Sequence, residues 1–475
     1  MKLQVQDISN SEFNLMHESV LRLLSEFGVL FEDQTARDLL AKAGNKTGEK
    51  GRVHLSEKFV ESMLAQVPKV GFMMYGRDES KTLQVAVDKM AFRPSTGAPF
   101  VLDYETKSRR ESTMDDARMM VTLVDALDGY DMVNSVVSLA DAPGGKGNLG
   151  RFVNAHRYSL KPSDITVMTR QEVEAIAKIS VIIRGGEKQL REKPLTAMDV
   201  AMITPLRCPK EQVEALMECA KWGLPIEVLT SPAMGMTSPI TVAGSTVVAM
   251  AEVIAALCLV YLIEPGLGII NTTRVSPTNM YTTAYNYGAP ELGISSVLSG
   301  ALSNRYHIPT NLYGLGTVAK MPGSQASLEK TFGGLLMALS QPHMITGGGL
   351  LDNAIITSPE QLVIDNEAIR FIKRICKPIE IDQESIGLEV FMRNMSDEGV
   401  LLVEEHTLKH LRAGEMIDAS LGQWVSYSEW QKQGCPDLFD LAHEKVEQIL
   451  AEHIVEPFDA KLESEINRIV EESEF

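Results

Sequence analysis

The chain has 475 residues, of which 44% are apolar and 23% are charged, as in an ordinary globular protein. Its 45 basic and 63 acidic residues give a formal net charge of −18. No polybasic tract offsets this charge, which excludes nucleic acid and anionic membranes as expected partners. The five cysteines are scattered without a C-x-x-C pair, and the N-terminus lacks the apolar core of a signal peptide. We therefore expect a cytoplasmic protein.

Residues 1–90 predict a small α+β module. Apolar side chains recur with helical spacing over 11–28, 35–43 and 56–67, where Gly28, Gly44 and Pro68 are the expected ends. Strands are expected over 70–75 and 83–87. The module should pack on the domain that follows it.

From residue 91 to 355 an apolar strand and an amphipathic helix recur in alternation, which predicts a (β/α)₈ TIM barrel, an α/β fold. The expected strands are 96–102, 132–140, 165–169, 198–204, 225–230, 267–273, 310–315 and 343–348. The clearest helices between them are 171–184, 209–222, 241–261, 290–304 and 324–340. The apolar stretch from Val247 to Ile263 is interrupted by Glu252 and is better explained as a buried barrel helix than as a membrane span.

The last segment, 356–475, predicts a helical C-terminal extension. Helical patterns follow one another over 359–376, 383–394, 400–412 and 437–453 with no strand between them. The acidic end, 456–475, is expected to fray or to mediate contacts. A large barrel with a long helical tail also suggests a homo-oligomer.

The richest segment for function is 309–349. A short strand from Pro309 to Gly314 leads through a loop into a helix, and the next strand ends at Thr346 with Gly347, Gly348 and Gly349. Sites of barrel enzymes lie at the carboxyl ends of the strands. Glycines there allow a ligand to approach the backbone closely.

Tyrosines gather just before this segment. Tyr281 and Tyr285 are four residues apart, as on one face of a helix, and Tyr287 suits the adjoining turn. With Tyr313 they form a candidate site for a quaternary ammonium group, which aromatic ring faces attract. Ordinary packing would explain the tyrosines equally well.

Two arginines lie near expected strand ends. Arg274 and Arg93 are each candidates for pairing with a substrate carboxylate, and each is equally compatible with a structural salt bridge.

The usual catalytic and metal-binding patterns are missing. His406 and His410 are four residues apart, but no third ligand is evident, so no metal site is expected. There is no G-x-S-x-G, and no acid–base constellation identifies a catalytic residue.

Several short runs together carry a resemblance to a known family. They are His17–Leu24, Phe100–Asp103, Ser238–Gly244, Gly288–Glu291, Gly347–Leu351 with Glu360–Leu362, and Glu405–His410. In this order and spacing the chain resembles the trimethylamine methyltransferase family. The resemblance implies a TIM barrel that moves a methyl group from a methylamine to the cobalt of a partner corrinoid protein. The chain has no Asp-x-His-x-x-Gly run, which resembles the cobalamin-binding motif, so the corrinoid is expected on the partner and no cofactor on this chain.

The resemblance points to the non-pyrrolysine branch. Archaeal trimethylamine enzymes carry pyrrolysine in a run that looks like Ile364–Ile369, where an ungapped match places it at Ala368. Relatives without pyrrolysine act on quaternary amines such as glycine betaine, proline betaine or carnitine. A quaternary nitrogen is already cationic and leaves as a neutral amine, so no general acid is required.

The sequence therefore predicts a quaternary amine:corrinoid protein methyltransferase, with Glu367 as a further ammonium partner. A methyltransferase for a tertiary methylamine and a non-catalytic betaine-binding protein remain as alternatives.

Overall fold

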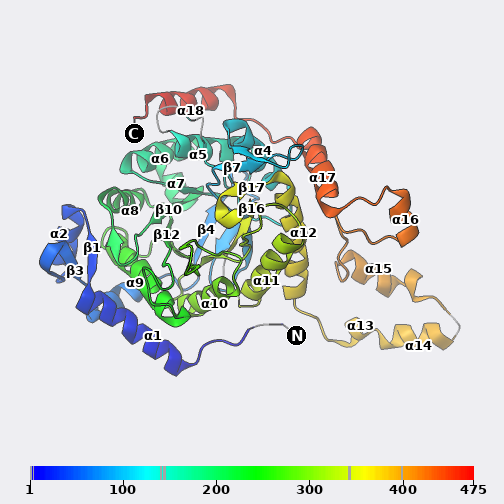
Figure 1. Cartoon of the computed structure of the whole chain (residues 1–475), viewed down its shortest axis with the longest axis horizontal. Helices are drawn as coiled ribbons and strands as arrows, with labels where there is room; N and C mark the ends of the chain where they lie inside the picture. Colours follow the sequence, from blue (N-terminus) through cyan, green and yellow to red (C-terminus); the bar gives the residue numbers. More distant parts are fainter. Residues whose placement is uncertain are drawn as a thin grey trace.

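Eight parallel strands close into a barrel inside a ring of helices (Figure 1). The computed structural model describes residues 3, 5–139, 142, 146–340, 344–396 and 399–474. The barrel strands are β6 (Ala91–Pro94), the extended segment 132–137, β9 (Ser163–Thr166), β10 (Thr196–Ala201), β12 (Ile226–Thr230), β13 (Ile269–Thr273), β14 (Asn311–Tyr313) and β15 (Met344–Gly348). Parallel bridges from Asn271 to Thr310 and from Val133 to Ser163 join the separate sheets. The backbone N–H of Asp131, which donates to the carbonyl of Phe92 at 2.7 Å, closes the barrel between β6 and the segment 132–137.

Each barrel strand is followed by one helix of the outer ring. These helices are α4 (Met114–Ala126), α5 (Gly147–Arg157), α6 (Arg170–Arg184), α8 (Lys210–Trp222), α9 (Val242–Tyr261), α10 (Pro290–Arg305), α11 (Ser324–Ser340) and α12 (Pro359–Cys376). A short α7 (Glu187–Glu192) follows α6. Because α12 packs between α11 and α4, the ring continues past residue 355, the barrel boundary expected from the sequence.

The TIM barrel is thus confirmed, but its first strand was placed wrongly. The barrel strand is Ala91–Pro94, not 96–102, because Arg93 points into the barrel and interrupts the apolar pattern that marks the other strands. Gly97, with a positive φ of 82°, and Pro99 follow outside the strand. Residues expected in the strand instead enter a small sheet at the rim. It contains β7 (Phe100–Leu102), β8 (Arg109–Glu111), β16 (Leu350–Leu351) and β17 (Ile356–Thr357).

The N-terminal residues form helices and a small sheet that cover α9. The elements are α1 (Asn10–Arg22), β1 (Val29–Phe31), α2 (Gln34–Lys42), β2 (Lys46–Thr47), β3 (Arg52–His54) and α3 (Glu57–Leu64), with β1 paired to β11 (Arg207–Cys208) of a barrel loop. α1 and α3 pack directly on α9. Among the described residues α9 is the one helix long and apolar enough to cross a membrane, but 78% of its most apolar window is buried inside the protein.

A hairpin closes the amino end of the barrel. Strands β4 (Phe72–Tyr75) and β5 (Thr82–Val85) place Met74 and Val85 against the lowest side chains of the lumen. Those side chains are Ala91, Met132, Ala197, Ile270 and Met344. The lumen therefore has an apolar floor, and a ligand site must open at the carboxyl ends of the strands.

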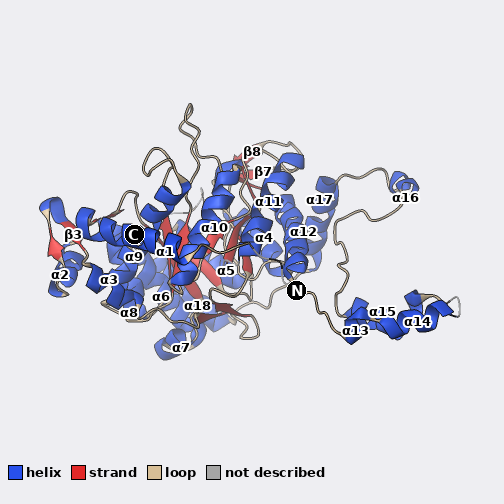
Figure 2. Cartoon of the chain, turned by 90° about the horizontal axis from the view of Figure 1, so that it is seen from below, coloured by secondary structure: helices blue, strands red, loops and turns tan. Residues whose placement is uncertain are grey.

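The C-terminal helices divide into two groups. α17 (Leu438–Glu452) packs against α12 and α4, and α18 (Ala460–Glu472) packs on α6 with Ile466 fully buried, so the acidic end makes contacts. By contrast, α13 (Gln383–Ile386), α14 (Leu388–Ser396), α15 (Glu405–Arg412) and α16 (Tyr427–Lys432) project from the barrel (Figure 2).

Candidate active site

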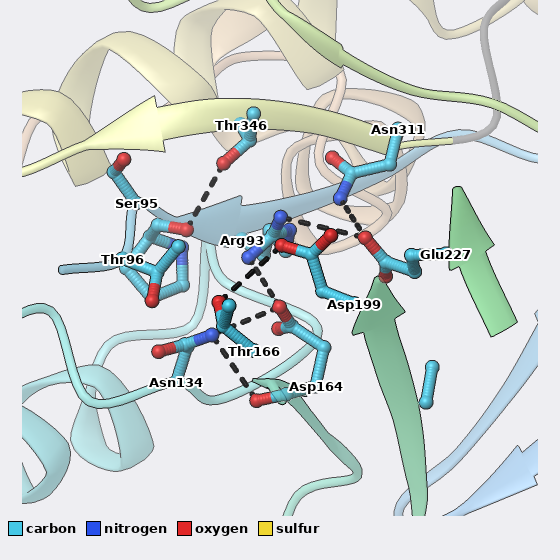
Figure 3. Close-up of polar contacts among 12 residues, drawn as sticks. Arg93, Ser95, Thr96, Asn134, Asp164, Thr166, Asp199, Glu227, Asn311 and Thr346 are labelled. Carbon is cyan, nitrogen blue, oxygen red and sulfur yellow. Dashed lines mark hydrogen bonds and ion pairs between the residues drawn. The ribbon is translucent and has the colours of Figure 1, made fainter. Parts of the chain in front are cut away.

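Above the apolar floor lies a layer of buried charge (Figure 3). Asp164 of β9, Asp199 of β10 and Glu227 of β12 all point into the lumen, where Arg93 of β6 reaches them. Arg93 Nη1 lies 2.6 Å from Asp164 Oδ2, and its Nη2 lies 3.6 Å from Glu227 Oε2. Arg93 is therefore paired with protein carboxylates.

Amide and hydroxyl side chains hold the same carboxylates in place. Asn134 Nδ2 donates to Asp164 Oδ2 at 2.8 Å. Asn311 Nδ2 and Thr272 Oγ1 both donate to Glu227 Oε2, at 2.6 and 3.1 Å. Thr166 Oγ1 donates to Asp199 Oδ2 at 3.4 Å. Each carboxylate is thus bound through one oxygen.

The second oxygen of each carboxylate has no donor. Asp164 Oδ1, Asp199 Oδ1 and Glu227 Oε1 are buried and lack a hydrogen-bond partner among the residues that the structure describes. Buried polar atoms without a partner are rare and costly, so they point to a missing ligand or proton. Burial raises the pKa of Asp164 to about 7, although Arg93 opposes the shift. Burial and neighbouring Glu227 raise the pKa of Asp199 to about 6.

We expect the stability of the protein to fall as the pH rises from 5 to 8. The folded-state pKa values of Asp164 and Asp199 lie above the ordinary value of 3.8, so the folded protein holds protons that the unfolded chain has released. Their contribution is complete below pH 3.8 and is lost as the pH passes about 7. Urea unfolding should show a drop of roughly 1–3 kcal/mol between pH 5 and pH 8.

Replacing Asp164 or Asp199 by Asn should reduce that drop, since an amide does not titrate. Exposed Asp418 replaced by Asn is the matched control and should leave the drop unchanged. A wild-type stability that rises over this interval would contradict the assignment.

At the top of the lumen, aromatic rings lead from solvent toward Arg274. Tyr285 and Tyr287 stack with ring centroids 6.0 Å apart and an interplanar angle of 8°. Tyr287 contacts the ring of buried Tyr313, with centroids 5.0 Å apart. The guanidinium carbon of Arg274, at the end of β13, lies 5.2 Å from the centre of the Tyr313 ring. Four of the residues predicted from the sequence are therefore brought together.

Arg274 and Arg93 both have a buried Nε and Nη2 without a hydrogen-bond partner within the described part of the chain. They differ because, among the described residues, Arg93 forms ion pairs with carboxylates and Arg274 forms none. Two nitrogens on the same side of a guanidinium match the two oxygens of a carboxylate. Binding of a substrate carboxylate by Arg274 therefore stays a prediction, whereas Arg93 forms the structural ion pair that the sequence also allowed.

Tyr281 does not join this group. It is 98% exposed on a loop, because residues 274–289 form no helix that would align it with Tyr285. The side chain of Asn279 accepts from the backbone N–H groups of Tyr281 and Thr282, and Thr283 has a positive φ of 60°. These contacts form a turn in place of the expected helix.

The residues at the end of β15 lie beside the lumen but have mainly structural contacts. Thr346 Oγ1 donates to the carbonyl of Pro94 at 3.1 Å. A Cβ on Gly347 would lie 2.6 Å from the carbonyl oxygen of Leu315, and one on Gly348 would lie 2.6 Å from the ring of Tyr130. Packing of the chain on itself is thus enough to require these glycines, and their contact with a ligand stays a prediction.

Glu367 lies outside the lumen. It is on α12, where it accepts from the backbone N–H of Ser420 at 2.9 Å and pairs with Arg370 at 3.2 Å. The run Ile364–Ile369, matched above to the pyrrolysine segment, belongs to the same helix. Position 368 therefore does not face the lumen, and the ungapped match does not locate a substrate-binding position.

Comparison with known proteins identifies the family. The family model described as "Trimethylamine methyltransferase (MTTB)" matches residues 3–474. The chain belongs to this family. Its members are methyltransferases of the methylamine type, and the barrel lumen is accordingly the candidate active site.

Curated relatives in the trimethylamine methyltransferase family span the whole chain. Trimethylamine methyltransferase MttB of Desulfitobacterium hafniense (strain DSM 10664 / DCB-2) is 27% identical over 470 residues, which are 98% of this chain and 93% of that protein. The glycine betaine methyltransferase of D. hafniense (strain Y51) is 24% identical over 465 residues, 98% of this chain and 96% of that protein. Among solved structures, monomethylamine methyltransferase MtmB of Methanosarcina barkeri superposes with a TM-score of 0.52 at 13% identity, covering 93% of this chain and 88% of that one. This likeness shows the fold.

Proposed function

We propose that this member of the family transfers a methyl group from a carboxylated quaternary amine to the reduced cobalt of a corrinoid carried by a partner protein. Glycine betaine, proline betaine and carnitine are the substrate types considered. The observation that carries the proposal is the pairing of partnerless Arg274 nitrogens with the ring column Tyr285–Tyr287–Tyr313. A betaine has a carboxylate that Arg274 can bind and a quaternary ammonium group that the tyrosine rings can bind.

The lumen residues suit a permanent cation. Ring faces attract an alkylated ammonium group without a hydrogen bond, which a quaternary nitrogen cannot donate. Below the rings, Asp199 and Glu227 add negative charge. Binding the carboxylate at Arg274 would fix the position of the nitrogen, and so leave one methyl group pointing toward the open mouth.

The transfer itself needs no acid on this chain. The carbon–nitrogen bond breaks with its electron pair remaining on nitrogen, so the product is a neutral tertiary amine. The reduced cobalt supplies the electron pair for the new bond to the methyl carbon. The tasks of the chain are to orient the methyl group and to exclude water.

The rim of the barrel fits contact with a corrinoid on another protein. Large apolar side chains are exposed on three successive loops after the strands: Met168, Ile203, and Met236 with Ile240. Exposed apolar side chains gathered around a site indicate an interaction surface. These side chains would contact the flat apolar face of the macrocycle and its carrier.

An assay of cobalamin methylation tests the proposal. The purified chain is mixed with chemically reduced cobalamin and each of a panel of amines, and methylated cobalamin is followed by its absorbance. We expect methylation from at least one betaine and none from trimethylamine. Failure of every betaine would reject the function, and tight calorimetric binding in that case would favour a non-catalytic betaine-binding protein.

A second candidate is a tertiary methylamine substrate. The donor-free oxygens of Asp164, Asp199 and Glu227 would accept the N–H of a protonated tertiary amine, which is the observation in its favour. Methylation from trimethylamine, with a rate that rises as the pH passes about 7 and Asp164 ionises to become an acceptor, would support this candidate.

Replacing Tyr287 by Leu should lower kcat/KM for a betaine by roughly 10- to 30-fold. The ring lies between Tyr285 and Tyr313, and a desolvated cation–π contact contributes up to about 2 kcal/mol. Tyr287→Phe keeps the ring face and should retain activity within about threefold. Equal losses in the two variants would indicate that the hydroxyl group, not the ring face, matters.

A further inference from the structure

One helical segment of the chain has no core of its own. Residues 379–412, here called the arm, contain α13, α14 and α15 and project from the barrel (Figure 2). No side chain that the structure describes in this segment is buried. Large apolar side chains are nevertheless frequent, and the most exposed are Ile381, Ile386, Leu402 and Val403.

Helices this short are not stable in water unless an apolar face is buried. The contacts within the arm are polar and exposed, such as Lys409 with Glu384 and Arg393 with Glu404. Exposed ion pairs contribute little stability. Another surface must therefore cover the arm.

The barrel presents an uncovered apolar surface on α10 and α11. These two helices have only four charged residues, Glu291, Arg305, Glu329 and Lys330, and Lys330 is buried. The shorter helices α6 and α8 each have five. On the outer face Ile294, Leu328 and Phe332 are 51%, 57% and 68% exposed. Together with Tyr287 and Tyr313 they line an apolar cavity of ≈ 580 Å³ between α10 and α11, and Ile294, Leu328 and Phe332 are here called the wall.

The neighbouring helix shows what such a surface requires. α9 is also apolar on all sides, with Glu252 as its one charged residue, and the N-terminal module covers it through α1 and α3. Among the residues that the structure describes, no such module covers the wall. Residues 5–7 reach only the other end of the groove, near Val297, Ala301 and Leu339.

We propose that the arm of one copy packs on the wall of a second copy, and that the reciprocal exchange forms a two-fold dimer. Each copy has one arm and one wall, so a two-fold axis covers both apolar surfaces in both copies. The arm, residues 379–412, is long enough to supply the 20–30 residues that each partner contributes to a specific interface. The wall has few charges to repel the acidic arm.

Sedimentation of the full-length protein at about 1–10 μM tests the exchange. The wild type should sediment as a dimer or a multiple of it. Leu402→Glu in the arm and Phe332→Glu in the wall should each produce monomers that keep the wild-type circular dichroism, since both side chains are exposed in one copy. Val70→Glu is the matched control, because Val70 is 76% exposed on the N-terminal module, and it should leave the dimer intact.

A cross-link identifies the contact. Exposed Cys435 is first replaced by Ser, and a tagged Phe332→Cys protein is mixed with an untagged Leu402→Cys protein and a short bismaleimide. A covalent pair containing one chain of each kind is expected, and none when Val70→Cys replaces Leu402→Cys. A monomeric wild type, dimers that survive both Glu variants, or an arm protected only by a different added protein would each overturn the proposal.

Discussion

Replacing Arg93 by Met is expected to lower the free energy of unfolding by about 3–5 kcal/mol, the usual effect of removing one partner of a buried ion pair. Arg93 is fully buried and compensates Asp164 at 2.6 Å and Glu227 at 3.6 Å. Without it, both carboxylates stay in the lumen with no opposite charge at their contact. Urea denaturation followed by circular dichroism measures the change.

The loss of unfolding free energy in Arg93→Met should depend on pH and on the charge of Asp164. Burial raises the pKa of Asp164 to about 7, so at pH 5 this group accepts a proton and Arg93→Met should be less damaging there than at pH 8. Adding Asp164→Asn should recover part of the lost stability, because one uncompensated charge is removed. Arg170→Met is the control: it breaks an exposed pair with Glu174 and should cost under about 1 kcal/mol. Equal losses at the two positions would contradict a charged lumen.

Replacing Arg274 by Met should lower kcat/KM for a betaine by about 100-fold. A hydrogen bond to a charged group contributes about 1.5–3 kcal/mol, and Arg274 has two buried nitrogens free to make one. Methionine keeps much of the volume of the side chain over Tyr313 and removes the charge.

The decisive comparison uses two substrates in the same variant. Tetramethylammonium has the quaternary nitrogen but no carboxylate, so its turnover should be unchanged or improved in Arg274→Met. For a betaine, the kcat/KM of Arg274→Lys should lie between those of the wild type and Arg274→Met. Lysine keeps the positive charge but lacks the planar guanidinium that binds both carboxylate oxygens. Equal losses of activity toward the betaine and tetramethylammonium would show that Arg274 maintains the structure of the barrel's open end and does not bind a carboxylate.

The barrel was predictable from the sequence because most of its strands are short apolar runs that alternate with helices of regular period. The exception is instructive. In β6 the charged Arg93 occupies the centre of the strand, so the apolar pattern that identified the other strands is absent there. A strand that contributes a charge to the lumen loses the feature by which strands are recognised.

The carboxylates of the lumen were missed for a related reason. Asp164, Asp199 and Glu227 each stand as the one acidic residue in a buried strand, and each alone looks like an ordinary polar position. The signal lies in their repetition on three neighbouring strands, because Asp199 pairs in register with Glu227 in the folded sheet. Buried acids are rare enough that such a repetition marks a site.

The high density of tyrosines in the sequence indicated the aromatic part of the candidate site, but the sequence predicted the places of these tyrosines only in part. Tyr285, Tyr287 and Tyr313 meet as expected, whereas Tyr281 was assigned through a helix that Asn279 prevents. Glu367 was assigned from a sequence match, but it lies on the side of α12 that contacts the C-terminal segment and not in the lumen. Position along the chain shows which side chains are near a strand end, but not on which side of a helix they lie.

The most direct test compares glycine betaine with N,N-dimethylglycine as methyl donors to reduced cobalamin in the presence of the purified chain. Both carry a carboxylate and, at neutral pH, a positive charge, but the second has an N–H in place of one methyl group. If ring faces select an alkylated nitrogen, betaine should be used at least about 100-fold more efficiently. Equal use, or preference for the amine that carries a proton, would contradict the account.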